Sequence, residues 1–137
     1  MTINEIQDQI IDDFSFFDDW MEKYEYIIDL GKKLPLIDAK YKVDDNLIRG
    51  CQSRVWLRAE MNSDKVEFTA DSDAVITKGI IGLLIQVLNN QRAEDIARSE
   101  LYFIDKIGLK EHLSPTRSNG LLSMVKQMKL YGVALNG

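Results

Sequence analysis

The chain has 137 residues, 45% of them hydrophobic and 28% charged, which is the balance of a globular protein and excludes a disordered chain. One cysteine and one histidine exclude an internal disulfide and are too few for a zinc or iron–sulfur site. The net charge of −5 argues against binding nucleic acid through its phosphates. With no visible signal peptide and no run of about 18–20 apolar residues, we expect a cytoplasmic protein without membrane contact, folded as a single domain over residues 1–137.

Two amphipathic helices are predicted at the start of the chain. Apolar residues at helical spacing indicate a helix over residues 3–14, and Thr2 followed by Glu5 has the form of a capping box. A second apolar stripe over residues 17–28 indicates another helix, with the aspartate pair 18–19 in its first turn. We expect these two helices to pack against each other.

Charge is distributed unevenly along the first half of the chain. Residues 1–30 contain nine acidic residues and one lysine, whereas residues 32–58 contain seven basic residues and three acidic ones. The acidic face of the first two helices is either a solvated surface or a docking surface. The single cysteine, Cys51, lies within the basic stretch.

A small antiparallel sheet is predicted after Pro35. Apolar residues alternate over 55–61 and again over 66–70, with a polar turn at 62–64 between them, which indicates a hairpin with one buried face. Val43, Leu47 and Ile48 predict a short additional strand, so we expect about three strands.

Helices are predicted to cover the buried face of this sheet. The segment Asp71-Ser72-Asp73 supplies capping residues for a run over residues 74–88 that is apolar on almost every side, and Gly79 and Gly82 are expected to allow close packing against the sheet.

The remainder of the chain is predicted to be helical. Short amphipathic helices are expected at 93–98 and 102–107, and Ser114-Pro115 begins a last helix that runs to the end. The order of helices and strands predicts an α+β fold.

Cys51 is the residue best suited to take part in a chemical reaction. Gly50 allows the backbone to turn immediately before it, and Arg49 and Arg54 on either side are expected to favour the thiolate over the thiol. The residues alone leave two readings open, a buried structural cysteine and a reactive one. His112, the sole histidine, is expected on the surface near the start of the last helix.

Three segments resemble the SufE family of cysteine desulfuration proteins. The most specific is Gly50-Cys51-Gln52-Ser53-Arg54-Val55-Trp56-Leu57, within a wider match over residues 43–57. The segments 71–81 and 113–121 resemble the acidic turn into the central helix and the start of the C-terminal helix of the family. One departure is that the segment 91–94 lacks a proline that many relatives carry, which leaves the start of that helix in doubt.

The resemblance implies a fold and a function. The fold is a compact α+β domain shared with NifU-like scaffolds, with an N-terminal helix pair, a central buried helix and C-terminal helices. The function is to accept sulfur from a pyridoxal-phosphate cysteine desulfurase of the SufS/CsdA type, to stimulate that enzyme and to pass sulfur toward a SufBCD-like iron–sulfur scaffold complex. A carrier of this kind is a sulfur-transfer partner without turnover of its own, holds no cofactor or metal, and is a monomer or weak homodimer.

The resemblance also implies roles for individual residues. Cys51 maps onto the sulfur-accepting cysteine of the family, and Gly50, Gln52 and Ser53 form its supporting loop. As hypotheses, Gly50 permits the loop to move, and a sheltered resting position protects the persulfide from reductants.

Several neighbouring residues have two interpretations each. Arg49 and Arg54 are expected to contact the partner. Arg117 either pairs with Asp71 or Asp73 and braces the cysteine loop, or lies over the surface of its own helix. Trp56, on the outer strand face, is either packed under a helix or available for docking.

The sequence leaves open two alternatives to the sulfur-carrier function. A one-cysteine peroxidase would oxidise Cys51 with peroxide in the absence of any desulfurase. A non-covalent adaptor would stimulate a desulfurase without using Cys51.

Overall fold

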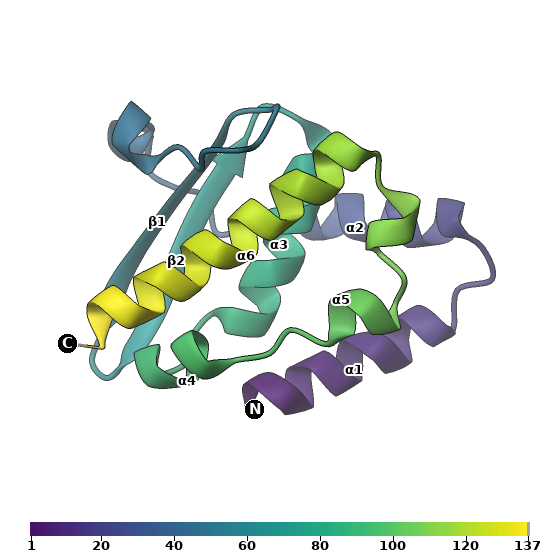
Figure 1. Cartoon of the computed structure of the whole chain (residues 1–137), viewed down its shortest axis with the longest axis horizontal. Helices are drawn as coiled ribbons and strands as arrows, with labels where there is room; N and C mark the ends of the chain where they lie inside the picture. The colour runs from purple at the N-terminus through teal and green to yellow at the C-terminus, as the bar shows by residue number, and fades with distance from the viewer. Residues whose placement is uncertain (137) are drawn as a thin grey trace.

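The computed structural model describes residues 1–136 as two N-terminal helices, a β-hairpin and four further helices (Figure 1). Helices α1 (Ile3–Ser15) and α2 (Trp20–Lys32) precede strands β1 (Val55–Asn62) and β2 (Lys65–Ser72). Helices α3 (Val75–Leu88), α4 (Ala93–Arg98), α5 (Phe103–Lys106) and α6 (Pro115–Leu135) follow the hairpin. Short 3-10 turns occur at Ala39–Tyr41, Asp44–Asn46 and Lys110–His112. The α+β fold is therefore confirmed.

The residues at the N-termini of the first two helices form caps largely as predicted. The capping box is formed, with the Glu5 backbone N–H donating to Thr2 Oγ1 over 3.1 Å and the Thr2 N–H donating to Glu5 Oε1 over 3.0 Å. Helix α2 begins later than predicted, because Asp19 is its N-cap and accepts from the Glu22 N–H over 2.9 Å. The prediction that the aspartate pair 18–19 lies in the first helical turn was therefore wrong.

The expected pairing of α1 with α2 is not the main packing of either helix. Helix α2 lies along α3, while α1 contacts α3 and α5. The buried Gln7 fastens α1 to the segment before α5, since its amide donates to the Glu100 carbonyl over 3.0 Å and accepts from the Phe103 N–H over 3.1 Å. An aromatic contact, with the ring centres of Phe14 and Tyr26 5.3 Å apart, connects α1 directly to α2.

Glycines allow α2 and α3 to approach closely. A Cβ added to Gly31 would lie 2.9 Å from the backbone nitrogen of Gly79, and one on Gly82 would lie 3.1 Å from the Leu30 carbonyl oxygen. The prediction that Gly79 and Gly82 face the sheet was wrong. The close approach they permit is to another helix, which sequence periodicity could not identify.

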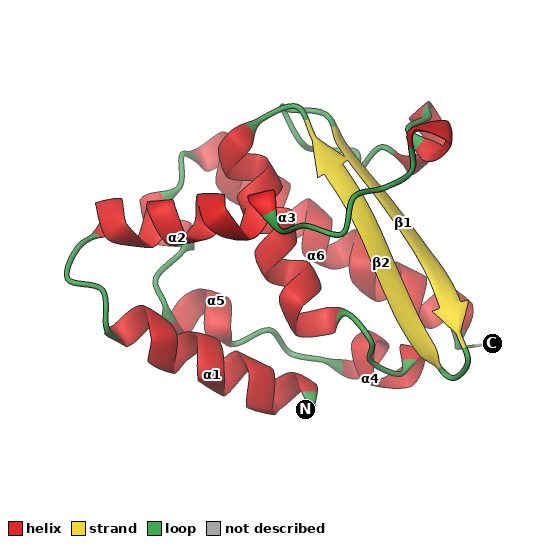
Figure 2. Ribbon diagram, turned by 180° about the vertical axis from the view of Figure 1, so that it is seen from behind, coloured by secondary structure: helices red, strands yellow, loops and turns green. Residues whose placement is uncertain are grey.

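The sheet has two antiparallel strands in the described chain, joined by the two-residue turn Ser63-Asp64 (Figure 2). The inward residues Val55, Leu57 and Phe68 are at most 1% exposed, and both views place α3 and α6 on one face of the hairpin. Met61, near the hairpin end, is 41% exposed although its cross-strand partner Val66 is fully buried, so β2 alone contributes to the buried face at this end.

The third strand predicted around residues 43–48 is not formed. Residues 44–46 make a 3-10 turn, and Leu47 forms only an isolated bridge with Trp56. The sequence Asp-Asp-Asn favours a turn because these side chains compete for backbone hydrogen bonds, and this preference prevails over the apolar residues beside it.

The segment 39–47 instead covers the outer face of β1. The ammonium of Lys42 lies 5.3 Å from the centre of the Trp56 ring, and the guanidinium of Arg58 lies 3.9 Å from that of Tyr41. Trp56 is therefore packed under a loop rather than under a helix.

The C-terminal helices agree with the predicted boundaries. Helix α4 begins at Ala93 without a side-chain cap, and Ser114 caps α6 by accepting from the Arg117 N–H over 3.3 Å. The buried side chains of α3 lie at the centre of the apolar core, although Val75 in its first turn is 64% exposed. No helix within residues 1–136 is both long enough and apolar enough to cross a bilayer.

Candidate functional site

Cys51 lies in the loop that connects the segment 39–48 to β1. The Ile48 N–H donates to the Val55 carbonyl over 2.8 Å, so the residues between them form a closed loop. Gly50 has a φ of +93°, which L side chains rarely adopt, and a Cβ there would also collide with the Ser123 hydroxyl of α6. The turn predicted before Cys51 is therefore present.

The thiol of Cys51 points toward α6 and not into solvent. Its Sγ donates to the Gly120 carbonyl over 3.6 Å, and a Cβ added to Gly120 would lie 3.4 Å from Sγ. Cys51 is half-buried in this arrangement. A methyl group at position 120 would therefore touch the thiol without overlapping it.

A small cavity of about 70 Å³ adjoins the thiol, several times the roughly 10–15 Å³ that admits a water-sized atom. Residues of the cysteine loop, α3 and α6 line it together with Cys51: Gln52, Ser53, Thr77, Ile80, Thr116, Arg117, Gly120 and Met124. The thiol is therefore next to free space, in a pocket whose rim includes the exposed Gln52, Thr116 and Arg117.

Burial raises the pKa of the Cys51 thiol above its ordinary value, because the thiolate would be poorly solvated there. Arg49 and Arg54 are exposed, so their charges remain in water. The prediction that these arginines favour the thiolate was wrong for this conformation, since burial is the only cause of the shift.

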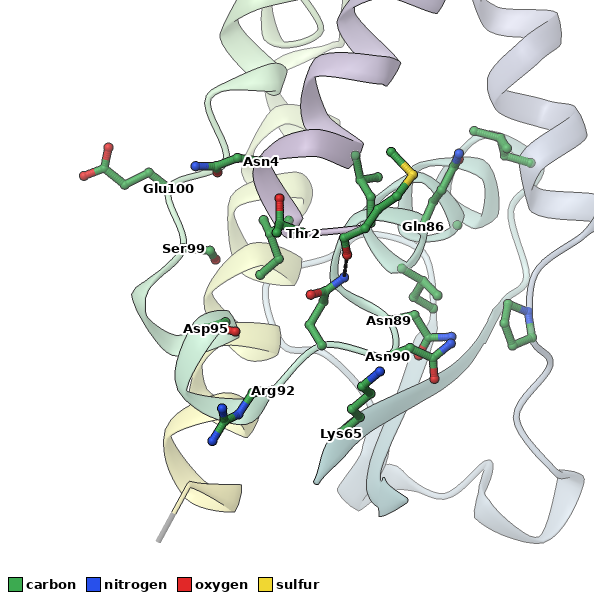
Figure 3. A pocket seen from close by; sticks show the side chains of 18 of the residues that line it. Thr2, Asn4, Lys65, Gln86, Asn89, Asn90, Arg92, Asp95, Ser99 and Glu100 are labelled. Carbon is green, nitrogen blue, oxygen red and sulfur yellow. Dashed lines mark hydrogen bonds between the residues drawn. The ribbon is translucent and has the colours of Figure 1, made fainter. Parts of the chain in front are cut away.

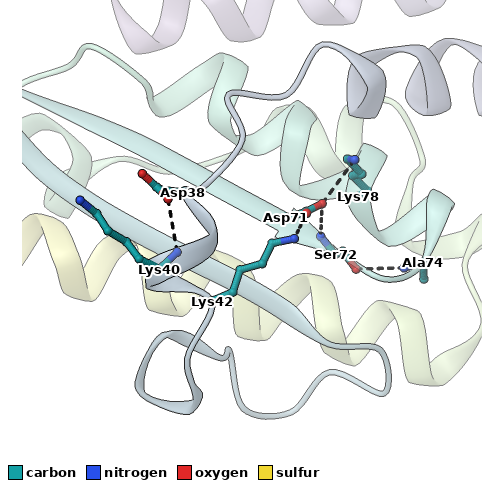
Figure 4. A network of polar contacts seen from close by, with 7 residues as sticks. All are labelled: Asp38, Lys40, Lys42, Asp71, Ser72, Ala74 and Lys78. Carbon is teal, nitrogen blue, oxygen red and sulfur yellow. Dashed lines mark hydrogen bonds and ion pairs between the residues drawn. The ribbon is translucent and has the colours of Figure 1, made fainter.

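Asp71 belongs to a network of ion pairs beside the site (Figure 4). It pairs with Lys42 and, over 3.3 Å, with Lys78 of α3, and it accepts from the Ser72 N–H over 2.8 Å. Burial alone would raise the pKa of Asp71, but the hydrogen bonds from Lys42, Ser72 and Lys78 outweigh it and hold that pKa below its usual range. The network fastens the segment 39–47 to the start of α3.

Asp73 holds the other side of the cysteine loop. Its carboxylate accepts from the Arg54 backbone N–H over 3.0 Å, while its own N–H donates to the Arg54 carbonyl over 3.3 Å. Neither aspartate caps α3, whose N-cap is Ala74 without a side-chain hydrogen bond, so the predicted capping was wrong.

Of the two readings of Arg117, the ion pair with Asp71 or Asp73 is not formed. Each aspartate has the partners described above, and the exposed Arg117 lies in the first turn of α6 beside the Cys51 cavity. The structure therefore brings Gln52, Ser53 and Arg117 together around Cys51.

Sequence reasoning missed the contribution of α6 and α3 to this site. Gly120 lies within the segment 113–121 that resembles the family, which was a signal, but no role followed from its position in the sequence. Ser123, Thr77 and Met124 carried no such signal, since only the tertiary fold brings them to the cysteine loop.

The other candidate features lie apart from Cys51. The exposed His112 stacks on Trp20 of α2 with ring centres 3.8 Å apart, and its Nδ1 is 3.0 Å from the Gly108 carbonyl oxygen. A groove of about 1460 Å³ runs between the N-terminus of α1, the end of α3 and α4, where Gln91 donates to the Met1 carbonyl over 3.0 Å (Figure 3). Across residues 1–136 no three His, Cys, Asp or Glu side chains are grouped to hold a metal ion.

Comparisons with known proteins agree on one family. The model of the SufE family, described as an Fe–S metabolism associated domain, matches residues 8–131. An uncharacterized SufE-like protein of Rhizobium meliloti is 41% identical over 127 residues, covering 89% of this chain and 91% of the relative. One from Rhizobium etli is 42% identical over 127 residues, covering 89% and 86%.

A plant relative and a solved structure extend the likeness. The chloroplastic/mitochondrial SufE-like protein 1 of Arabidopsis thaliana is 41% identical over 108 residues, covering 78% of this chain and 29% of that longer protein. The solution structure of a hypothetical protein from Thermus thermophilus has a TM-score of 0.79 at 20% identity, covering 96% of this chain and 97% of its own, which supports the fold alone. The chain belongs to the SufE family, and its role lies in iron–sulfur metabolism as an accessory protein of sulfur transfer.

Proposed function

We propose that this protein accepts sulfur from a pyridoxal-phosphate cysteine desulfurase onto Cys51, stimulates that enzyme, and passes the sulfur to an iron–sulfur assembly scaffold. One observation carries the proposal: the single cysteine of a SufE-family chain lies in a loop, half-buried, beside a cavity that would hold one additional sulfur atom. Family membership already implies a cysteine desulfurase as the partner.

The proposed reaction follows the logic of thiol–disulfide exchange. The Cys51 thiolate attacks the terminal sulfur of the desulfurase persulfide, a new S–S bond forms on Cys51, and the bond to the desulfurase cysteine breaks. The desulfurase cysteine leaves as a thiolate, so no external oxidant or reductant is needed. Because the chain has one cysteine, no second thiol within it could discharge the persulfide as an internal disulfide.

The geometry supports a carrier that is inactive until it is engaged. In the resting conformation burial raises the thiol pKa, and the sulfur faces α6. Movement of the loop toward the donor would expose Cys51 and restore its solvation, with Gly50 at the turn. On return, the terminal sulfur would enter the cavity between α3 and α6, shielded from reductants.

Intact-protein mass spectrometry tests the proposal. The protein and its Cys51→Ser variant are each incubated with a SufS-type desulfurase and free cysteine. We expect a mass increase of one sulfur atom on the wild type that reductant removes, and none on the variant. Acceptance of sulfur by Cys51→Ser would overturn the role of Cys51. Stimulation of the desulfurase without added sulfur would indicate an adaptor, and rapid consumption of peroxide alone would indicate a peroxidase.

A further inference from the structure

The floor of the Cys51 cavity is formed by α3 and α6. Four of the residues that line the cavity are buried: Thr77, Ile80, Gly120 and Met124. Ile80 and Met124 are apolar, and Gly120 has no side chain. Thr77, which is 7% exposed, therefore contributes the one polar side chain among the described residues of this floor.

The hydroxyl of Thr77 is open to the cavity. Within residues 1–136 it forms no hydrogen bond, yet no buried side-chain oxygen there is both sealed from solvent and without a partner. The oxygen therefore keeps contact with free space, and the space that Thr77 lines is the Cys51 cavity. Ile80, three residues later and on the same side of α3, lines the same cavity, which agrees with this orientation.

A sulfur atom bonded to Cys51 Sγ would extend into this space. The thiol itself already donates to the Gly120 carbonyl, so the Thr77 hydroxyl is left for an atom beyond Sγ. An S–S bond is roughly 2 Å long, and a sphere of about 70 Å³ is only about 5 Å across. The terminal sulfur of a persulfide would therefore lie close to the cavity walls, which include Thr77.

A persulfide changes what the cavity has to stabilise. Sγ then carries no proton, so its hydrogen bond to the Gly120 carbonyl is lost, and the negative charge of the ionised persulfide lies on the terminal sulfur. An anion away from water is costly unless a donor bonds to it, and hydrogen bonds to charged groups are stronger than those between neutral ones. A hydroxyl can supply that donor, whereas a carbonyl only accepts.

We propose that the Thr77 hydroxyl donates a hydrogen bond to the terminal sulfur of the Cys51 persulfide and stabilises its anion in the cavity. This inference rests on the proposed function and adds the residue that binds the transferred sulfur. In the sulfur-free protein the hydroxyl lacks this partner, so its effect arises only after loading.

Chemical loading makes the test independent of a desulfurase. The Cys51 thiolate attacks a sulfur atom of inorganic polysulfide, a new S–S bond forms on Cys51, and the shortened polysulfide leaves with the bonding electrons. Because the chain has one cysteine, the persulfide forms at a single position. Intact mass confirms one added sulfur atom after the polysulfide is removed, and the ultraviolet absorbance of the persulfide anion is followed against pH.

Three variants isolate the contribution of the hydroxyl. Thr77→Val replaces it with a methyl group of similar size, and Thr77→Ser retains it. Thr69→Val makes the same change on the outer face of β2, between the inward residues Phe68 and Ala70. Arg117, the charged residue at the cavity rim, is present in all of these proteins, so its effect on the titration is common to them.

The proposal predicts opposite effects on the loaded and unloaded protein. Thr77→Val should lower the acid dissociation constant of the persulfide about 10-fold, with Thr77→Ser and Thr69→Val within about threefold of the wild type. Unloaded Thr77→Val should unfold at the same urea concentration as the wild type or a higher one, because no hydrogen bond is lost. After mixing with a persulfide-loaded SufS-type desulfurase, the ratio of sulfur on Cys51 to sulfur on the enzyme should fall in Thr77→Val.

The outcomes separate this inference from the function beneath it. An unchanged persulfide titration in Thr77→Val would overturn the inference, as would an equal change in Thr77→Ser or Thr69→Val. Reduced stability of unloaded Thr77→Val would give the hydroxyl a structural role and would also overturn it. A wild type with the expected persulfide titration that takes no sulfur from the desulfurase would overturn the proposed function alone.

Discussion

The chemistry available to Cys51 depends on its immediate neighbours. The thiol lies between the Gly120 carbonyl and a small cavity, and burial raises its pKa. Because the deprotonated form is disfavoured, the resting protein holds less thiolate at neutral pH than free cysteine does. A partner that draws the loop into solvent would remove this restraint.

The raised pKa predicts slow alkylation of the folded protein. We expect the rate of reaction of Cys51 with iodoacetamide to rise with pH, with a midpoint above the value of about 8.5 for free cysteine. In denaturant the thiol is solvated, so the midpoint should return to about 8.5. A folded-state midpoint at or below that of the denatured chain would contradict the buried resting position.

The contact between Gly120 and the thiol of Cys51 can be tested by substitution. In Gly120→Ala the new Cβ would lie 3.4 Å from Sγ, at the short limit of van der Waals contact, so it crowds the sheltered position of Cys51 only modestly. We expect alkylation about 2- to 5-fold faster, which corresponds to roughly 0.4–1 kcal/mol in favour of the open loop. The free energy of unfolding in urea should change little, because the roughly 1 kcal/mol by which alanine favours a helix interior over glycine offsets the crowding of Cys51. An unchanged alkylation rate would show that Gly120 does not determine the room for the thiol.

At the level of elements, the contact of α2 with α3 sets the position of the central helix, and α3 in turn lines the Cys51 cavity with Thr77 and Ile80. In Gly79→Ala the new Cβ would collide with the backbone of Ile27, which cannot rotate away as a side chain does. We expect the free energy of unfolding in urea to fall by about 1–3 kcal/mol, the usual cost of overpacking.

Gln86→Ala serves as the control for that prediction. Gln86 is exposed on the same helix, so its truncation should change the free energy of unfolding by about 0.5 kcal/mol or less. Equal stability of Gly79→Ala and Gln86→Ala would mean that α2 and α3 can move apart without a cost in the free energy of unfolding.

On the scale of the whole molecule, the acidic and basic regions are separated. The connection between α1 and α2, with Asp12 and Asp18 exposed near it, lies at a different end of the molecule from the segment that leads into β1 (Figures 1 and 2). At about 0.15 M salt, interactions between exposed charges are screened beyond roughly 8 Å. The acidic face is therefore expected to act as a solvated surface.

Charge reversal tests this separation. Asp12→Lys with Asp18→Lys should leave association with a desulfurase within about twofold of the wild type at 0.15 M salt, whereas Arg49→Glu with Arg54→Glu should slow it several-fold. The arginine side chains are exposed, so the loop should keep its fold. A larger effect from the aspartate pair would make the acidic face a docking surface after all.

Features of the fold that depend on neighbours along the chain could be predicted from the sequence. The capping box at Thr2 and Glu5, the hairpin and the helix start at Ser114 follow from local hydrogen bonding and side-chain alternation, which operate over a few residues. The SufE family could also be inferred from short motifs, the most specific of which contains Cys51.

Which surfaces pack against each other became known from the folded chain. The partner of Gly79 is a helix rather than the sheet, the residues around 43–48 form a turn that lies over Trp56, and Arg117 remains apart from Asp71. The thiol pKa likewise follows from burial against α6, some 69 residues away in the chain, and not from the adjacent arginines. Desolvation and close packing depend on everything that surrounds a group in space, and one sequence read along its length does not contain that information.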